Sequence, residues 1–234
     1  MKYNTIGIIG AMVEEIELLH QHVDVKTEKS QAGITYFEGV LHGKNVVYCK
    51  SGVGKVNAAV CTQKLIDMGA DCILFTGVAG AVDPVLNIGD IVVSSSCVQH
   101  DMDVTPLGFE RGQIPYQDNW DFRADSALIQ LAQAAADDLF PGKYCLGKVL
   151  SGDQFIASRE TVKQLYEELG GACTEMEGAA VAQVCDMNSV PFVVIRSMSD
   201  RADGSAHVNF AEFTVIAANN SFHIIDHIVS HMNE

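Results

Sequence analysis

The chain has 234 residues, enough for one large domain or two small ones, and its hydrophobic content of 48% is ample for a core. Its 15 Lys and Arg residues against 30 Asp and Glu residues give a formal net charge of −15, without a basic cluster. The backbone of a nucleic acid would be repelled by such a surface, so we expect no nucleic-acid partner.

Nothing in the sequence predicts a membrane span or a secretion signal. No segment approaches the roughly 18 consecutive apolar residues of a spanning helix, and the start lacks a long apolar region. The seven cysteines are scattered and odd in number, without a Cys-x-x-Cys pair, at positions 49, 61, 72, 97, 145, 173 and 185. We therefore expect a cytoplasmic protein with reduced thiols and no membrane association.

The first half of the chain alternates short apolar runs with segments of helical spacing. We predict strands over 6–12, 33–41, 45–51, 72–76 and 90–99, and helices over 13–22 and 56–68. His42 and Gly43 separate the second and third of these strands, which predicts a hairpin. The second of the helices should bury Ala58, Ala59, Leu65 and Ile66.

The second half continues the alternation after a long irregular segment. Residues 100–119 carry two prolines and two glycines without periodicity, which predicts a loop of a length that is often functional. We then predict helices over 123–139, 158–169 and 210–232, and strands over 144–150 and 191–196. The last helix should bury Phe213, Ile216, Ala217, Ile224, Ile225 and Ile228.

No linker, repeat or low-complexity segment divides this pattern. Alternating strands and helices predict an α/β fold with a mixed central sheet covered by helices on both faces. We expect one domain over residues 1–234, an α/β/α sandwich.

The stretch from Thr174 to Cys185 sets two acids against a run of small apolar residues that must be buried. On an extended segment Glu175 and Glu177 would point one way and Met176 the other. A carboxylate at the mouth of the following buried helix is a costly placement that chemistry could justify. The alternative is a capping box, because Thr174 and Glu177 have the spacing of that motif.

Five further strand ends carry glycine or polar residues, where ligands of open α/β sheets bind. They are residues 10–15, 51–54, 76–80, 151–156 and 197–200. None of these sets holds a cluster of basic side chains that would suit a phosphate. The segment Ser51–Lys55 lacks the spacing of a P-loop, which excludes binding of a nucleoside triphosphate through that motif.

Taken together, five segments resemble the 5′-methylthioadenosine/S-adenosylhomocysteine nucleosidases, a branch of the nucleoside phosphorylase superfamily. They follow the family's order from near the start of the chain to Asp200, over residues 7–15, 51–59, 149–156, 175–180 and 190–200. The resemblance implies a nucleoside phosphorylase-like fold and hydrolysis of the adenine N-glycosidic bond of methylthioadenosine, adenosylhomocysteine and 5′-deoxyadenosine. It implies neither a cofactor nor a metal.

The resemblance also implies a role for each acid. Asp200 would protonate a purine ring nitrogen, with Ser199 beside it, and its pKa should be raised so that it stays protonated. Glu177 would bind the ribose hydroxyls and offset the oxocarbenium charge. Glu15 would be the general base for water, and Arg196 would help to hold that water or Glu15.

Glu14 is the rival of Glu15, but only one of two adjacent helical residues can face a pocket, and the position of the Gly-Ala-Met turn favours Glu15. The other substrate-binding residues that the resemblance implies are Met12, Val53, Val78, Phe155, Ile156, Glu175, Met176 and Phe210. Each apolar residue among them could instead be ordinary core. Two positions depart from the family: Val78 stands where a serine is common, and Val13 replaces an acid.

Several alternatives stay open at this point. A phosphorylase would need cations around phosphate, but arginine occurs only at 111, 123, 159, 196 and 201, and we favour hydrolysis. A purine-binding module without activity would need the pocket but not three acids.

His223, His227 and His231 could ligate a metal, although a solvated stripe explains their spacing. In the 100–119 loop, Val104, Leu107 and Ile114 suit a homodimer contact.

Overall fold

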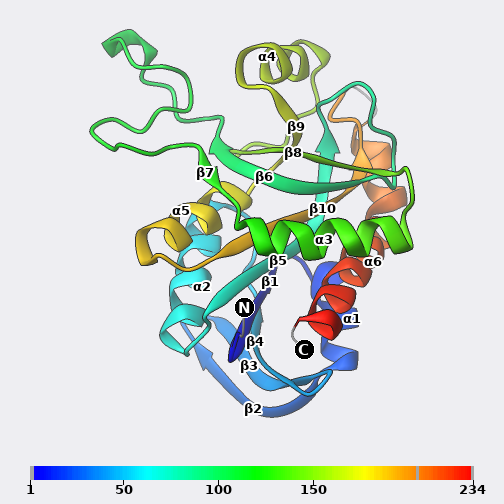
Figure 1. The fold of residues 1–234 in the computed structure, drawn as a ribbon. Coiled ribbons are helices and arrows are strands. Elements are labelled where there is room, and N and C mark those ends of the chain that lie inside the picture. The colour runs from blue at the N-terminus through cyan, green and yellow to red at the C-terminus, as the bar shows by residue number, and fades with distance from the viewer. Residues whose placement is uncertain (1–2, 204–205, 233–234) are drawn as a thin grey trace.

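The computed structural model describes residues 3–203 and 206–232, and it has a mixed ten-stranded sheet with helices on both faces (Figure 1). The strands are β1 (Thr5–Gly10), β2 (Asp24–Gln31), β3 (Ile34–Leu41), β4 (Lys44–Lys50), β5 (Cys72–Ala81), β6 (Ile91–Gln99), β7 (Phe122–Arg123), β8 (Tyr144–Ser151), β9 (Gly171–Glu175) and β10 (Phe192–Asp200). The helices are α1 (Val13–His22), α2 (Lys55–Asp67), the 3₁₀ turn η1 (Thr105–Leu107), α3 (Ser126–Leu139), α4 (Arg159–Leu169), α5 (Gly178–Asn188) and α6 (Ala206–His231). The predicted α/β class is confirmed.

Strand β5 is the centre of the sheet. It pairs in parallel with β1 and β10, and its last residues pair antiparallel with β9. From β10 the pairing continues through β6, β8 and β9 back to β5, so this part of the sheet closes into a ring. The strands β1, β4, β3 and β2 extend from β5 as an open wing.

Helices cover both faces of the sheet. Apolar residues of α2 and α5 share one core cluster with β5 and β6, while α1, α3 and α6 share a second cluster with β1 and β10 (Figure 1). Because both faces are covered, β5 and β10 are buried along their whole lengths, which explains their continuous apolar runs.

The hairpin between β3 and β4 forms as predicted. His42 and Gly43 have φ values of 50° and 75°, the positive pair of a two-residue turn that suits twisted strands. Strand β2 was not predicted, because every residue of it is exposed and its polar sequence carries no apolar alternation. It forms by antiparallel pairing with β3 at the edge of the sheet.

The predicted elements differ from the structure mainly at their ends. Strands β5 and β10 run four or more residues past their predicted limits, so Gly77–Gly80 and Ser197–Asp200 are strand residues. On α6, Ile216 is 56% exposed, which corrects its predicted burial, and Phe213 is half-buried. On α2, Ala59 and Ile66 are half-buried, and Cys61 and Thr62 join Ala58 and Leu65 on the buried side.

Helix α5 begins differently from a capping box. Its N-cap residue is Glu177 without a side-chain cap bond, and Thr174 lies inside β9, so the capping-box alternative is wrong. The first amide of the helix, the N–H of Gly178, instead donates to the carboxylate of Glu175 at 2.8 Å. Because β9 ends at Glu175, the predicted alternation does not extend to Glu177.

The 100–119 segment is irregular as predicted, apart from η1, and it projects from the body of the molecule (Figure 1). Leu107 at its tip is exposed, but Ile114 packs into a core cluster and Val104 is half-buried. Only Leu107 of the three predicted contact residues is therefore strongly exposed. Over the described ranges, no helix has both the length and the apolarity needed to cross a bilayer.

Candidate active site

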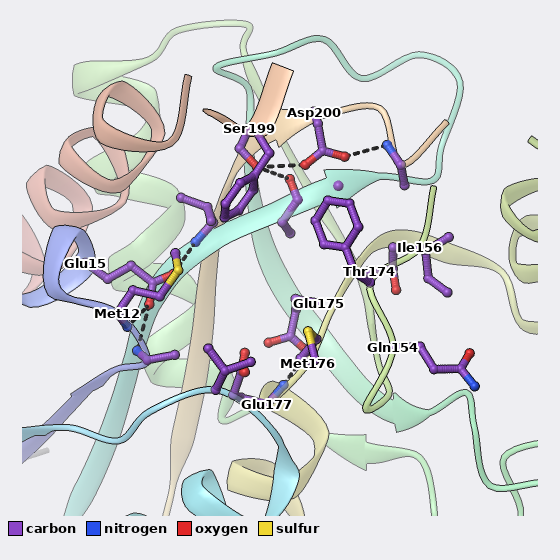
Figure 2. A pocket seen from close by; sticks show the side chains of 18 residues that line it. Met12, Glu15, Gln154, Ile156, Thr174, Glu175, Met176, Glu177, Ser199 and Asp200 are labelled. Atoms are coloured by element: carbon purple, nitrogen blue, oxygen red, sulfur yellow. Dashed lines mark hydrogen bonds between the residues drawn. The ribbon is translucent and has the colours of Figure 1, made fainter. Parts of the chain in front are cut away.

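A cavity of about 330 Å³ opens at the carboxyl ends of β1, β5 and β10 (Figure 2). This is the edge of the sheet where ligands of α/β proteins bind, and the volume suits a small molecule. Its lining comprises Ala11, Met12, Glu15, Val53, Val78, Ala79, Gly80, Gln154, Phe155, Ile156, Thr174, Glu175, Met176, Glu177, Ser199, Asp200, Ala202 and Phe210.

The three acids that the sequence singled out all line this one cavity. Glu15 comes from α1, Glu177 from the start of α5 and Asp200 from the end of β10, and each is less than a tenth exposed. Glu175 also lines the cavity, and burial of these carboxyl groups among largely apolar walls is costly unless each finds partners. Their partners therefore define the chemistry of the site.

The carboxylate of Glu15 is held by backbone amides at two strand ends. One oxygen accepts the N–H groups of Ala11 and Met12 at 2.7 and 2.9 Å, and the other accepts the N–H of Val78 at 2.9 Å. Burial raises the pKa of Glu15, while Arg196 and these amides oppose the rise. Glu14, the rival residue, is exposed and does not line the cavity.

One carboxylate oxygen of Glu177 accepts a hydrogen bond from the backbone N–H of Gly54 at 2.7 Å. The pKa of Glu177 is raised to about 8, first by burial and then by the nearby charge of Glu175. The Gly54 amide and Arg196 act against this rise. At neutral pH the free site therefore holds a proton at or near Glu177.

Glu175 lines the cavity, and several protein groups bind its carboxylate. Its carboxylate forms a buried ion pair with Arg196 at 2.6 Å and accepts hydrogen bonds from Ser151 and the amide of Gly178. The guanidinium of Arg196 stacks 3.9 Å from the ring of Phe75. Burial would lower the pKa of Arg196, but the neighbouring acids raise it, so the side chain stays charged.

Arg196 is the one expected site residue that lies outside the cavity lining. It sits behind the wall, where an ideal Cβ on Gly77 would lie 3.0 Å from its Nη1 atom and 2.5 Å from Glu15. Because Gly77 has no side chain, the guanidinium of Arg196 can lie near the carboxylate of Glu15 and interact with it electrostatically. The hydrogen bonds of Arg196 go to Glu175 and to backbone carbonyls.

Asp200 lies at an irregularity of β10, where the register against β5 shifts between Met198 and Asp200. Such bulges re-aim side chains next to functional sites. The Ser199 hydroxyl donates to Asp200 Oδ2 at 2.9 Å, and the N–H of Ala202 donates to Oδ1 at 2.7 Å (Figure 2). The backbone thus fixes one carboxylate oxygen of Asp200, and the Ser199 hydroxyl forms a hydrogen bond with the other.

The remaining walls are apolar. The rings of Phe155 and Phe210 meet edge to face with 5.7 Å between centroids, and Met12 and Phe210 pack against Val78. All the apolar residues expected to line a pocket do so, namely Met12, Val53, Val78, Phe155, Ile156, Met176 and Phe210. A flat aromatic ligand fits between such walls.

Six lining residues were not singled out from the sequence, namely Ala11, Ala79, Gly80, Gln154, Thr174 and Ala202. Four of them lie in or beside strand-end segments that were noticed for their glycines, so position alone could have found them. Thr174 is buried, and its hydroxyl has no hydrogen-bond partner among the described residues. Nothing in its sequence context distinguished it from a capping residue.

The histidines of α6 lie far from this cavity. His227 contacts Asp138 at 3.1 Å and stacks on His231 with 4.0 Å between ring centroids. His223 is exposed. Within the part of the chain that the structure describes, no cluster of three metal-ligating side chains occurs.

Comparison with known proteins gives matches over nearly the whole chain. The family model described as "Phosphorylase superfamily" matches residues 5–230. The 5′-methylthioadenosine/S-adenosylhomocysteine nucleosidase of Anoxybacillus flavithermus is 40% identical and covers 98% of this chain and 99% of its own.

Solved structures give the same result. The nucleosidase of that name from Neisseria meningitidis, in complex with methylthio-immucillin-A, has a TM-score of 0.93 at 40% identity and covers 97% of this chain and 99% of its own. Futalosine hydrolase of Helicobacter pylori has a TM-score of 0.91 at 35% identity, with 97% of each chain covered. The sheet and helices are thus those of the nucleoside phosphorylase fold, and the chain belongs to the 5′-methylthioadenosine/S-adenosylhomocysteine nucleosidase family of N-glycosidic hydrolases within the phosphorylase superfamily.

Proposed function

We propose that this protein hydrolyses the adenine N-glycosidic bond of 5′-methylthioadenosine and S-adenosylhomocysteine, and that it also accepts 5′-deoxyadenosine. The observation that carries the proposal is the convergence of Glu15, Glu177 and Asp200 on one cavity with apolar walls. The family supports the reaction, and the cavity supports the substrate, because a purine and a thioether both favour apolar surroundings.

Asp200 is the general acid in this proposal. Adenine leaves poorly as an anion, so protonation of a ring nitrogen assists cleavage of the bond to the anomeric carbon. The proton would reside on Asp200 Oδ2, where Ser199 can accept a hydrogen bond from the acid as readily as it donates one to the carboxylate. The fixed Ala202 amide on Oδ1 supports this orientation.

Glu15 is the general base and Glu177 the ribose-binding acid. As the bond breaks, water adds to the anomeric carbon and loses a proton to Glu15, whose amide contacts hold it beside the cavity. Once its proton has been lost, the ionised Glu177 accepts a hydrogen bond from a ribose hydroxyl and offsets the positive charge of the oxocarbenium-like transition state. The products are adenine and the free thioribose.

The other expected contacts follow the cavity walls. Phe155, Ile156 and Ser199 border the purine side in this proposal, and Met12, Val53, Val78, Met176 and Phe210 surround the sugar and its 5′-group. Glu175 joins the site as the partner that neutralises Arg196, and the two together support Glu177 and Glu15. No cofactor enters the reaction.

Phosphorolysis is the closest alternative, and the lining argues against it. Among the described residues, the cavity lining includes no Lys or Arg, while a phosphate dianion needs cationic partners. The deciding experiment is adenine release from methylthioadenosine with and without phosphate. Equal rates support hydrolysis, and a strict phosphate requirement would overturn it.

The assignment of the acid is tested by Asp200→Asn. We expect kcat to fall by about 10²- to 10⁴-fold, because the amide cannot donate a proton to the leaving group. Retained binding of adenine, measured by calorimetry, controls for loss of the fold. A variant that hydrolyses as fast as the parent contradicts the assignment, and a parent that binds adenine without turnover indicates a binding module.

We also propose that the protein is a homodimer of the cytoplasm. Val56 on α2 and Met187 on α5 are each 74% exposed, and Figure 1 draws both helices on the same side of the molecule as the projecting loop. Exposed apolar side chains of this kind favour association. The seven unpaired cysteines suit a reducing compartment.

Sedimentation of the parent and of Val56→Glu tests the dimer. We expect a dimer for the parent and dissociation of the variant, because a charge buried in an apolar interface is costly. Val85→Glu, equally exposed between β5 and β6, is the matched control and should remain dimeric. A monomeric parent at micromolar concentration contradicts the proposal.

A further inference from the structure

Three segments beside the cavity are tied together by one side chain that does not line it. Asp101, at the start of the 100–119 loop, accepts a hydrogen bond from Lys55 Nζ at 2.7 Å with Oδ1 and from the N–H of Asp153 at 3.0 Å with Oδ2. The carboxylate of Asp153 in turn accepts the N–H of Lys55 at 2.8 Å. We call Lys55, Asp101 and Asp153 the Asp101 clamp.

The clamp is a closed circuit of hydrogen bonds between distant parts of the sequence. It joins the turn between β4 and α2, the end of β6 and the turn between β8 and α4. The side chains of Lys55 and Asp101 are only 17% and 16% exposed, so their ion pair is partly shielded from water. Lys55 Nζ also donates to Gln99 Oε1 at 2.9 Å, which fixes its direction.

Both turns that the clamp joins carry walls of the cavity. Lys55 directly follows Gly54, whose N–H donates to Glu177, and Val53 lines the cavity. Asp153 directly precedes Gln154, Phe155 and Ile156, which also line it. Displacement of either end of the clamp would therefore move groups that face the ligand.

Packing alone holds these walls weakly. Val53 is 49% exposed and Phe155 is 45% exposed, so only part of each side chain is packed against the protein. The two turns also approach closely: an ideal Cβ on Gly54 would lie 3.2 Å from Asp153 Oδ1, and Gly54 itself has φ of 100°. A non-glycine residue at position 54 would be strained in this conformation. The direction of the Gly54 N–H toward Glu177 depends on the same backbone conformation.

We propose that Asp101 is a positioning residue of the nucleosidase reaction, which holds the Gly54 amide against Glu177 and the 153–156 turn over the purine. A carboxylate is necessary at position 101 because each of its two oxygens accepts a hydrogen bond from a different donor, Lys55 Nζ and the N–H of Asp153. An asparagine retains one acceptor and turns an amide group toward the second donor. The inference rests on the proposed function for its kinetic consequence, but not for its structural one.

The first arm of the test is kinetic. For Asp101→Asn we expect kcat/KM for methylthioadenosine to fall on the order of 10- to 10²-fold, because small misplacements of binding groups are costly. The pH dependence should also move: without the Gly54 amide, the pKa of Glu177 rises above its value of about 8, and the corresponding limb of kcat/KM shifts toward alkaline pH. A residue that only stabilised the fold would not shift this limb.

Matched variants separate the clamp from a general effect of charge. Asp103→Asn removes the same charge two residues along the same loop, where the exposed Asp103 accepts hydrogen bonds from Thr105 of its own turn, and should behave like the parent. Lys55→Met breaks the clamp from the other side and should reproduce the loss. Lys55→Arg retains a cation for Asp101 and should recover activity to within about threefold.

The second arm does not depend on catalysis. Amide hydrogen exchange over 52–55 and 152–156 should accelerate at least tenfold in Asp101→Asn and Lys55→Met, and not in Asp103→Asn. Unchanged exchange overturns the clamp, and faster exchange with unchanged kcat/KM overturns its positioning role. If the parent releases no adenine, the proposed function fails while the exchange result still decides whether the clamp exists. If Asp101→Asn does not fold, Lys55→Met decides both arms.

Discussion

Glu175 and Glu177 are two residues apart, yet the structure gives them different electrostatic environments. Glu175 meets a guanidinium, a hydroxyl and an amide, which together satisfy its charge. Glu177 meets one amide, and its pKa rises to about 8. Arg196 pairs directly with Glu175, whereas Glu177 is held by the Gly54 amide, and both acids line the cavity.

The raised pKa of Glu177 predicts a pH-dependent stability. Between its ordinary pKa of 4.5 and about 8, the folded protein holds a proton that the unfolded chain releases, so this group lowers stability as pH rises through that window. Glu177→Gln removes this loss. We expect the variant and the parent to be about equally stable at pH 5, and the variant to be more stable at pH 8.5, by on the order of a few kcal/mol.

Urea unfolding at both pH values measures this difference. Glu17→Gln, an exposed position on α1, serves as the control and should leave the pH dependence of stability unchanged. Equal stability of parent and Glu177→Gln at pH 8.5 would show that Glu177 titrates in the fold as it does in the unfolded chain.

At the scale of elements, the carboxyl end of β5 determines how closely the catalytic groups approach. Gly77 separates Glu15 from Arg196, and Gly80 lies against Asp200 and Ala202, where an ideal Cβ would be within 2.8 Å of the Asp200 carboxylate. Side chains at either position would occupy the space that the acids use. The glycines of this strand are therefore explained by close approach, since neither has a positive φ.

Gly77→Ala tests this reading of β5. The added Cβ would lie 2.5 Å from Glu15 Oε1, so the carboxylate must leave the Val78 amide, and we expect kcat to fall by about 10²-fold. Single-turnover assays of adenine release measure the chemical step directly.

The control for Gly77→Ala is the same change in a Glu15→Gln background. If the methyl group acts through Glu15, the second change should cost less than about threefold there, because effects on one functional unit are not additive. A full 10²-fold loss in that background would mean that the alanine acts through Arg196 or through the strand itself.

For the whole molecule, the reactivity of the cysteines measures how accessible the core is to solvent. Six of the seven thiols have no exposure, and Cys145 is half-buried. Burial raises the pKa of Cys145 to about 11, so this thiol is rarely ionised at pH 8, and the other six are shielded by their complete burial. The thiolate is the reactive form, and the native protein should therefore resist alkylation.

Timed alkylation with iodoacetamide at pH 8, read by mass spectrometry, tests this. We expect slow modification of Cys145 alone in the native protein and of all seven cysteines in urea. Rapid labelling of several native cysteines would mean that the core opens on the timescale of the reaction.

Much of the site could be read from local sequence. The strand-end segments stood out for their glycine and polar residues, and the family resemblance then pointed to Glu15, Glu177 and Asp200, which all line one cavity. Strand β2 and the true cap of α5 could not be predicted, because β2 is defined by its partner β3 and the cap comes from Glu175 of the preceding strand. The sequence also could not predict that Arg196 lies outside the cavity lining, because its ion-pair partner Glu175 is 21 residues away in the chain.

Hydrophobic periodicity and turn residues act over a few neighbouring positions, so the alternation of strands and helices and the polar strand ends could be predicted from them. The ion pair between Glu175 and Arg196, the raised pKa of Glu177 and the closure of the sheet through β10 and β9 onto β5 emerge in the folded chain. Those outcomes depend on contacts between residues far apart in the chain, where distance and burial set the electrostatics.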